Sequence, residues 1–271
     1  MRVENNLIKE DTYTTPENRK RYLADRLCFG NRFHFYLRNF FIFFQTGMCA
    51  RRKHLDASMQ TYYSNKNFKL TEGCGGKIHI SGLKNLDVTD GKPVIMMGNH
   101  MSLLETAIFN AIIGPHLDFT YVIKKSLLKV PFFGDIMRSI NAIPLTRKNP
   151  REDLKMVLRE GKKILKSGKS IMLFPQGTRS EDFSPEKFNS IGIKLARSAG
   201  VPIIPFALKT DFLANGKFLR DLGPIRRDRK IYFKFGEPFM VKGNGREELL
   251  KVIEFMEKNI KAWRKEESEN S

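Results

Sequence analysis

Cysteine is scarce in this sequence, and its pattern argues against two kinds of small stabilised fold. The chain has an odd number of cysteines, Cys28, Cys49 and Cys74, and no two of them form a Cys-x-x-Cys pair. A disulfide framework uses paired cysteines, and a structural zinc site uses ligands at short, repeated spacings. The five histidines also lack a metal-ligand spacing such as His-Glu-x-x-His. We therefore expect no disulfide framework and no metal site, and a reducing compartment.

Long apolar runs are missing as well. The first 22 residues are polar and charged and contain no apolar core of a signal peptide. In the apolar region that follows, the longest run is Phe40–Phe44, five residues, whereas a spanning helix needs about 20. We expect no segment that crosses a membrane, although the protein can still lie on one.

Acidic residues are few relative to basic ones. The chain has 48 Lys and Arg against 29 Asp and Glu, a net charge of +19. Such a surplus favours anionic partners, namely nucleic acid, anionic lipid headgroups or phosphorylated ligands, and a general gain in solubility is the alternative. The basic residues are spread along the chain without a zinc-finger or RNA-binding signature, so we do not expect nucleic acid as a partner.

Short β-like runs alternate with helical patterns from residue 77 onward. Hydrophobic residues are 41% of the 271, enough for a sizeable core. Strands are predicted at residues 77–81, 93–97, 119–123, 141–145, 170–174, 202–208 and 231–235, and the clearest helices at 154–165 and 249–263. This alternation predicts an α/β domain with a mostly parallel central sheet flanked by helices. We place it at residues 66–271, ending in a polar tail from 265 to 271.

Residues 1–65 have a different composition. Residues 1–20 are predicted to be a flexible arm, and residues 29–48 are rich in aromatic side chains. The apolar residues that follow helical spacing are Phe33, Tyr36, Leu37, Phe40, Phe41, Phe44 and Met48. An aromatic helix bordered by basic residues is typical of an interfacial membrane anchor, and a helix packed on the protein's own core is the alternative. We expect an amphipathic anchor that attaches peripherally through residues 29–53.

The first candidate catalytic stretch, residues 98–106, reads GNHMSLLET and lies where a predicted strand gives way to a helix. His100 is a candidate general base, and Glu105 a candidate partner that orients it. Five helical positions turn through about 500°, so the two side chains meet only if His100 lies before the helix and folds back. Alternatively, Ser102 and Glu105 form a capping box with no catalytic role.

The second candidate stretch, residues 174–180, reads FPQGTRS and follows another predicted strand. Gly177 allows the backbone to approach a ligand closely, and Arg179 is suited to grip a phosphate. The alternative is a surface turn with a solvated arginine. The nearby Gly168-Lys169-Ser170 is not a nucleotide-binding loop, because Lys163 stands where that motif needs glycine.

Together the two stretches resemble the Asn-His-x4-Asp and Phe-Pro-Glu-Gly-Thr-Arg-Ser blocks of the glycerolipid acyltransferase family, which includes 1-acylglycerol-3-phosphate acyltransferases. Residues 121–147, 201–208, 223–225 and 235–238 are similar to further blocks of that family, in the same order. Two positions depart from its pattern. Glu105 replaces an Asp with a side chain one methylene longer, and Gln176 replaces a Glu and carries no charge.

The resemblance implies direct transfer of an acyl group from a thioester to a hydroxyl, with no covalent acyl-enzyme, no metal and no resident cofactor. His100 would take the hydroxyl proton while Glu105 orients it. The residues implied in substrate binding, mainly of the acceptor phosphate, are Asn99, Lys124, Arg147, Gln176, Gly177, Thr178 and Arg179. The donor would be acyl-CoA or acyl carrier protein, and the acceptor a lysophospholipid at an anionic membrane surface.

The leading acceptor is 1-acylglycerol-3-phosphate, which would give phosphatidic acid in phospholipid biosynthesis. Glycerol 3-phosphate, another lysophospholipid and a lyso-aminolipid are the alternatives. The Glu105 and Gln176 departures also leave open a non-catalytic lipid-binding relative. The expected location is the cytoplasmic face of a membrane, with peripheral or monotopic attachment.

Overall fold

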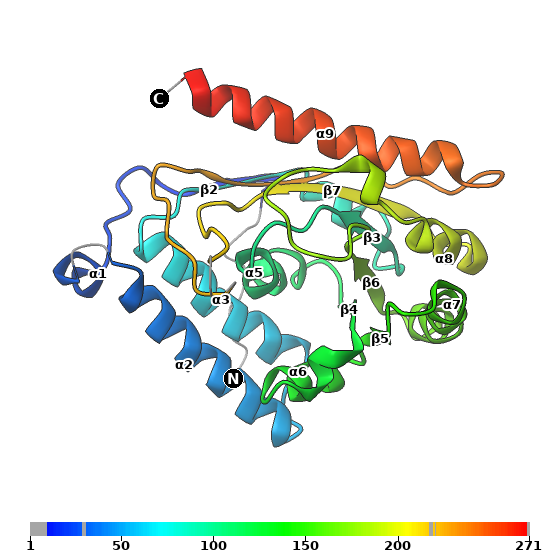
Figure 1. Cartoon of the computed structure of the whole chain (residues 1–271), viewed down its shortest axis with the longest axis horizontal. Coiled ribbons are helices and arrows are strands. Elements are labelled where there is room, and N and C mark those ends of the chain that lie inside the picture. Colours follow the sequence, from blue (N-terminus) through cyan, green and yellow to red (C-terminus); the bar gives the residue numbers. More distant parts are fainter. Residues whose placement is uncertain (1–9, 29–30, 217–218, 220, 270–271) are drawn as a thin grey trace.

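The computed structural model describes residues 10–269 apart from 29–30, 217–218 and 220 (Figure 1). The strands among these residues are β1 (Thr12–Thr14), β2 (Ile78–Ser81), β3 (Ile95–Gly98), β4 (Phe119–Lys124), β5 (Ile143–Leu145), β6 (Ser170–Leu173), β7 (Ile203–Lys209) and β8 (Ile231–Phe235). They form one eight-stranded sheet in the order β1-β2-β8-β7-β3-β6-β4-β5.

Most neighbouring strands in this sheet run parallel. The parallel pairs are β2–β8, β7–β3, β3–β6, β6–β4 and β4–β5, and the antiparallel pairs are β1–β2 and β7–β8. All seven strands predicted from the sequence are present, with ends that differ by no more than two residues. The structure therefore confirms the α/β fold with a mostly parallel central sheet.

Helices cover both faces of the sheet. The longer ones are α2 (Arg32–Arg51), α3 (Ala57–Gly73), α5 (Leu104–Ile113), α7 (Pro150–Lys166), α8 (Ile191–Ala199) and α9 (Arg246–Glu269), and the short ones are α1 (Leu23–Leu27), α4 (Lys84–Asp87), α6 (Phe133–Ser139) and the 3₁₀ turns η1 (Lys125–Lys129) and η2 (Pro185–Lys187). Figure 1 shows α7, α8 and α9 along the outer side of the curved sheet, and α2, α3 and α5 inside it.

Alternate residues of a central strand enter two separate cores. In β3, Met96 packs in the core with α3 and α5, whereas Ile95 and Met97 pack in the core with α7, α8 and α9. Successive side chains of a strand point to opposite faces, so a strand covered on both faces has to be apolar throughout. Every residue of β3, β6 and β7 is buried, and these strands are apolar except for Ser170 at the start of β6 and Lys209 at the end of β7.

The arm predicted for residues 1–20 is wrong where the structure describes it, because β1 lies within it. Residues 1–9 are outside the described residues. Thr12–Thr14 pairs antiparallel with β2, and the Tyr13 hydroxyl donates to Glu72 of α3 at 2.6 Å. Three polar and aromatic residues show no strand periodicity of their own. The strand forms by adding to an existing sheet edge.

The polar tail predicted for residues 265–271 is also wrong over its described part. Helix α9 continues to Glu269, and residues 270–271 lie outside the described residues. Glu267 is buried, and its carboxylate accepts from Lys209 Nζ at 2.6 Å and from Arg229 at 3.0 Å. Of the charged residues in this segment, Glu267 is thus ion-paired to Lys209 at the end of β7.

Helix α2 has two different apolar faces. Phe35 and Ile42 are buried in the core with α3. A second row on the same helix, the α2 apolar stripe, is 38–65% exposed and consists of Phe33, Leu37, Phe40, Phe41 and Phe44. The packing of Phe35 and Ile42 agrees with the alternative of a helix packed on the protein's own core, and the membrane anchor stays a prediction for the exposed stripe. The boundary placed between residues 65 and 66 falls inside α3.

The described helices include none with both the length and the apolar character needed to span a membrane.

Candidate active site

The candidate site lies at the carboxyl ends of three adjacent central strands. Asn99 and His100 follow β3, the stretch from Phe174 follows β6, and Thr210 follows β7. The carboxyl edge of a parallel sheet is where α/β folds place ligands and reactive groups. Gly98 ends β3 so close to β7 that a Cβ there would lie 2.2 Å from the Phe206 ring, which only glycine avoids.

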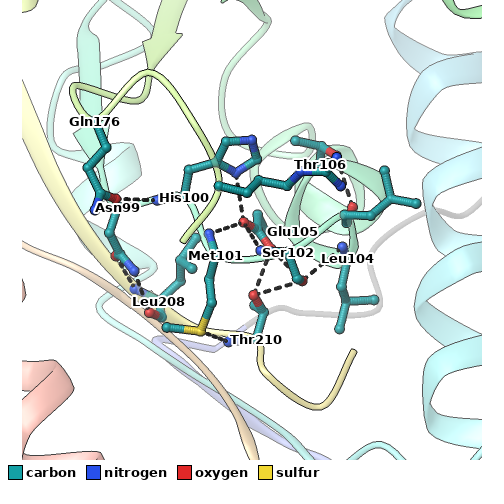
Figure 2. A network of polar contacts seen from close by, with 12 residues as sticks. Asn99, His100, Met101, Ser102, Leu104, Glu105, Thr106, Gln176, Leu208 and Thr210 are labelled. Carbon is teal, nitrogen blue, oxygen red and sulfur yellow. Dashed lines mark hydrogen bonds and ion pairs between the residues drawn. The ribbon is translucent and has the colours of Figure 1, made fainter. Parts of the chain in front are cut away.

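His100 and Glu105 form a hydrogen-bonded pair. His100 lies in the turn before α5 and folds back, so that its Nδ1 is 2.8 Å from Glu105 Oε1 (Figure 2). The Glu105 side chain is fully buried, and that of His100 is 17% exposed. The condition that the sequence set for their contact is therefore met.

The Glu105 carboxylate is held by donors on both oxygens. Oε1 accepts from the backbone N–H groups of Met101 at 2.7 Å and Ser102 at 2.8 Å, in addition to His100. Oε2 accepts from the Ser102 hydroxyl at 2.9 Å and the Thr210 hydroxyl at 2.7 Å. Burial alone would raise the pKa of the Glu105 carboxyl, but the hydrogen bonds from His100 and Thr210 and the adjacent imidazole outweigh burial and lower that pKa.

The ionised carboxylate settles which His100 nitrogen carries the proton. An ionised carboxylate only accepts hydrogen bonds, so Nδ1 must be the donor. In the neutral ring, Nε2 is then the basic nitrogen. No hydrogen bond to Nε2 forms within the part of the chain that the structure describes. The basic nitrogen of His100 thus faces away from its carboxylate partner.

The capping-box alternative for Glu105 is correct for the contact between Glu105 and Ser102, but not for the cap position. Glu105 reaches back to the Ser102 backbone N–H, as in a capping box, and the Ser102 hydroxyl accepts from the Leu104 N–H at 3.1 Å. The cap position itself is Leu103, one residue later than the sequence indicated, because the helix begins at Leu104. Since one carboxylate serves both the helix start and the imidazole, the two interpretations do not exclude each other.

The second motif packs directly over the first. The Phe174 ring stacks on the His100 imidazole with centroids 4.1 Å apart and an angle of 15°. Gln176 Oε1 accepts from the His100 backbone N–H at 3.1 Å, and the Ser180 N–H donates to the His100 carbonyl at 2.9 Å. A neutral amide oxygen is therefore sufficient for this contact at position 176.

Arg147 lies beside the second motif, in a left-handed turn with φ 59°. The Asp153 carboxylate fixes this turn by accepting from the Thr146 N–H at 2.9 Å, the Thr146 hydroxyl at 3.0 Å and the Arg147 N–H at 2.7 Å. Gly177 has φ 73°, and a side-chain carbon there would lie 3.9 Å from the Arg147 guanidinium carbon. The structure thus brings Arg147 and Gly177 together across 30 residues of sequence.

The remaining predicted site residues lie in three different settings. Arg179 forms an ion pair at 2.5 Å with Asp221, whose side chain is 61% exposed. Asn99 is buried, and its amide exchanges two hydrogen bonds with the Leu208 backbone, at 2.8 and 2.9 Å. Lys124 and Thr178 are exposed, and neither side chain has a hydrogen bond or ion pair among the described residues.

Two polar residues of the site were not found from sequence. Thr210 bonds to Glu105, and Asp153 holds the Arg147 turn. Thr210 comes two residues after a strand predicted to lie in a parallel sheet, and that position was a usable signal. Asp153 had no such signal, because an acidic residue in the first turn of a helix is ordinary.

Metal-binding capacity is not evident in the described residues, where no three His, Cys, Asp or Glu side chains cluster in a way that would hold an ion.

An α/β domain with a hydrogen-bonded His–carboxylate pair at the carboxyl ends of its central strands has side chains capable of proton transfer. Comparison with known families makes the class specific, because residues 77–209 match the family described as Acyltransferase. This stretch is an acyltransferase domain, which confirms the resemblance seen in the motifs. It includes both members of the dyad and every predicted binding residue.

Curated relatives carry one recurring name. The chain is 33% identical over 133 residues to a 1-acyl-sn-glycerol-3-phosphate acyltransferase of Pseudomonas aeruginosa, with 49% of each chain covered. It is 31% identical to the chloroplastic LPAT1 enzyme of that name from Arabidopsis thaliana, over 53% of this chain and 38% of the relative. A Borreliella burgdorferi protein of that name is 27% identical over 69% and 68%. The chain spans about half or less of the first two relatives.

A solved structure has the same fold over nearly the whole chain. The crystal structure of the 1-acyl-sn-glycerophosphate acyltransferase PlsC from Thermotoga maritima superposes with a TM-score of 0.63. The likeness covers 91% of this chain and 96% of that one at 22% identity. The shared fold therefore extends beyond residues 77–209.

Proposed function

We propose that this protein is a lysophospholipid acyltransferase that transfers a fatty acyl group from acyl-CoA or acyl carrier protein to the free hydroxyl of 1-acylglycerol-3-phosphate, giving phosphatidic acid. The observation that carries the proposal is the His100–Glu105 pair, with Nε2 of His100 directed away from the carboxylate, inside an acyltransferase domain. The recurring name of the relatives supports the choice of acceptor.

In the proposed reaction His100 acts first as base and then as acid. Nε2 takes the proton of the acceptor hydroxyl as its oxygen attacks the thioester carbonyl carbon. Glu105 stabilises the imidazolium that forms and keeps its orientation. The tetrahedral intermediate then expels the thiolate, which receives the proton from Nε2. One ester bond forms, one thioester bond breaks, and the imidazole returns to its starting state.

The acceptor phosphate is assigned to the arginines beside the second motif. Arg147 lies next to Gly177, where the absence of a side chain lets an anion approach the backbone. Arg179 pairs with Asp221, a largely exposed carboxylate that a phosphate group can displace. Lys124 and Thr178 are placed at the periphery of this site. We assign Asn99 and Gln176 to holding the loops rather than to gripping substrate, because both amides contact backbone.

The protein is proposed to work on a membrane surface, on the cytoplasmic face, attached through α2. The α2 apolar stripe exposes five large side chains along one helix, and Arg38, Arg51 and Arg52 are exposed on the same helix or directly after it. Such a helix can place its rings in the acyl boundary while arginines meet lipid phosphates. This arrangement would bring the site to its lipid acceptor.

The first test is transfer of a labelled acyl group to a panel of lysophospholipids and glycerol 3-phosphate in detergent or liposomes. Acyl-CoA and acyl carrier protein are offered separately as donors. We expect transfer to 1-acylglycerol-3-phosphate, and we expect His100→Ala to reduce it at least about 10²-fold with unchanged thermal unfolding. Transfer that survives His100→Ala would refute the mechanism. Lipid binding without transfer from either donor would support a non-catalytic relative instead.

A further inference from the structure

The second oxygen of Glu105 has its own set of donors, which the dyad alone does not require. Oε1 serves His100, whereas Oε2 points to two buried hydroxyl groups, those of Ser102 and Thr210 (Figure 2). The two hydroxyl oxygens are themselves 3.0 Å apart. Thr210 follows β7 and lies 105 residues from Glu105 in the chain, so this contact depends on the tertiary fold.

Counting protons separates the roles of the two hydroxyls. Each hydroxyl has one proton to donate. The Ser102 proton has two acceptors within reach, Glu105 Oε2 and the Thr210 oxygen, while its own oxygen accepts from the Leu104 N–H. The Thr210 hydroxyl donates to Glu105 Oε2 at 2.7 Å, and its oxygen can accept from Ser102 at the same time. Thr210 is therefore the hydroxyl with the shorter donor contact to Oε2, 2.7 Å against 2.9 Å for Ser102.

The end of β7 holds Thr210 in place. The preceding residue, Lys209, is 1% exposed, and its ammonium group pairs with Asp211 at 2.7 Å and with Glu267 of α9 at 2.6 Å. One residue earlier, the Leu208 backbone exchanges two hydrogen bonds with the side-chain amide of Asn99, which precedes His100. The Thr210 side chain is fully buried. Its hydroxyl thus approaches Glu105 from a strand end that is fixed on both sides.

We propose that Thr210 is a positioning residue for catalysis, whose hydroxyl holds the Glu105 carboxylate in the orientation that serves His100. Glu105 has one more rotatable bond than the Asp usual at this position, so its carboxylate has more freedom to lose. A donor on Oε2 removes that freedom by fixing the oxygen opposite the one that binds Nδ1. This inference rests on the proposed function of the dyad.

The test compares Thr210→Val with Thr120→Val. Valine keeps the shape of threonine and removes only the hydroxyl. Thr120 in β4 is a matched control, because it is also fully buried and its hydroxyl has no hydrogen-bond partner among the described residues. Thr210→Ser restores the hydroxyl. Thr210→Ala replaces Thr210→Val if the latter does not fold, as judged by thermal unfolding.

The readouts are kcat/KM at neutral pH and its pH profile. Loss of one hydrogen bond to a carboxylate should lower kcat/KM about tenfold in Thr210→Val, while Thr210→Ser and Thr120→Val stay near wild type. The Thr210 hydrogen bond lowers the pKa of Glu105. Its removal should raise that pKa, so the acid limb of the profile should move to higher pH. A purely structural threonine would not move that limb.

Measuring His100→Ala in parallel separates the positioning role of Thr210 from the proposed function of the protein. If His100→Ala is inactive and Thr210→Val shows both the loss and the shifted limb, the inference is supported. If His100→Ala is inactive but Thr210→Val has the activity and pH profile of Thr120→Val, the positioning role is overturned and the proposed function stands. An active His100→Ala would overturn both.

Discussion

At the scale of single residues, the site depends on side chains that hold other groups in place. Arg147 has a left-handed backbone, which residues other than glycine adopt rarely. The Asp153 carboxylate stabilises that conformation through the N–H groups of Thr146 and Arg147. The guanidinium reaches Gly177 because the turn is fixed in this way. Asp153 is thus expected to act on substrate binding without touching the substrate.

Asp153→Asn should weaken binding of the acceptor more than it slows the chemical step. The amide cannot accept from three donors as the ionised carboxylate does, so the Arg147 turn loosens. We expect the acceptor KM to rise about tenfold with kcat changed by less than about threefold. Glu152→Gln is the matched control, because Glu152 lies next to it in the same helix turn with a largely exposed side chain. A changed kcat with an unchanged KM would contradict this role.

Much of the catalytic pair was predictable from local sequence, whereas its supporting contacts were not. His100 and Glu105 are five residues apart, and the period of the α-helix predicts that they meet only if His100 lies before the helix and folds back. Thr210 and Asp153 contact the site through the packing of β7 and α7, and no short-range pattern specifies those distances. The assignment of Gln176 to substrate was also made from sequence, and its side chain instead accepts from the His100 backbone.

At the scale of elements, α2 combines a packed face with an exposed apolar one. The α2 apolar stripe was predictable because it follows helical spacing, and Phe33 and Phe40 are 65% and 62% exposed. What the sequence did not distinguish was the second face, on which Phe35 and Ile42 pack against the core. Both faces are rich in the same residue types, so composition alone does not separate them.

The double substitution Phe40→Ser and Phe41→Ser should weaken membrane binding and leave the fold intact. Both rings are exposed, so the free energy of unfolding should change by no more than about 0.5 kcal/mol per residue. Co-sedimentation with vesicles that contain anionic lipid should fall clearly, because burial of each ring contributes about 1.5–3 kcal/mol. Leu250→Ser on α9 is the control for an exposed apolar residue elsewhere. Unchanged co-sedimentation of the double variant would rule out the stripe as the anchor.

At the scale of the whole molecule, the last turns of α9 are tied to the strand that supports the site. Glu267 pairs with buried Lys209, and Glu266 accepts from Lys230 at 2.8 Å and from the Tyr232 hydroxyl at 3.0 Å. The polar composition of this segment predicted a polar tail, since charged residues are mostly exposed. Glu267 departs from that prediction because its partners are distant in sequence and come together only in the assembled sheet.

Glu267→Gln should destabilise the protein because it removes a charged partner from buried Lys209. Asp211 remains in contact with Lys209, so we expect a loss of about 2 kcal/mol rather than the larger cost of an isolated buried charge. Glu257→Gln on the same helix breaks only the exposed pair with Lys261 and should cost less than about 0.5 kcal/mol. Denaturant unfolding measures both. Equal stability of the two variants would show that the α9 contact contributes little.

The order of strands also has a consequence for how the chain is made. Strand β8 lies between β2 and β7, so β2 cannot join the main sheet until residue 231 has been synthesised, 150 residues after Ser81. At ordinary rates of translation this delay is roughly 8–30 s. During that time the edge of β2 that later pairs with β8 is open to other strands. Newly made chains are therefore expected to depend on chaperones at this stage. A chain released before residue 231 is expected to be an aggregation-prone fragment that lacks a complete sheet.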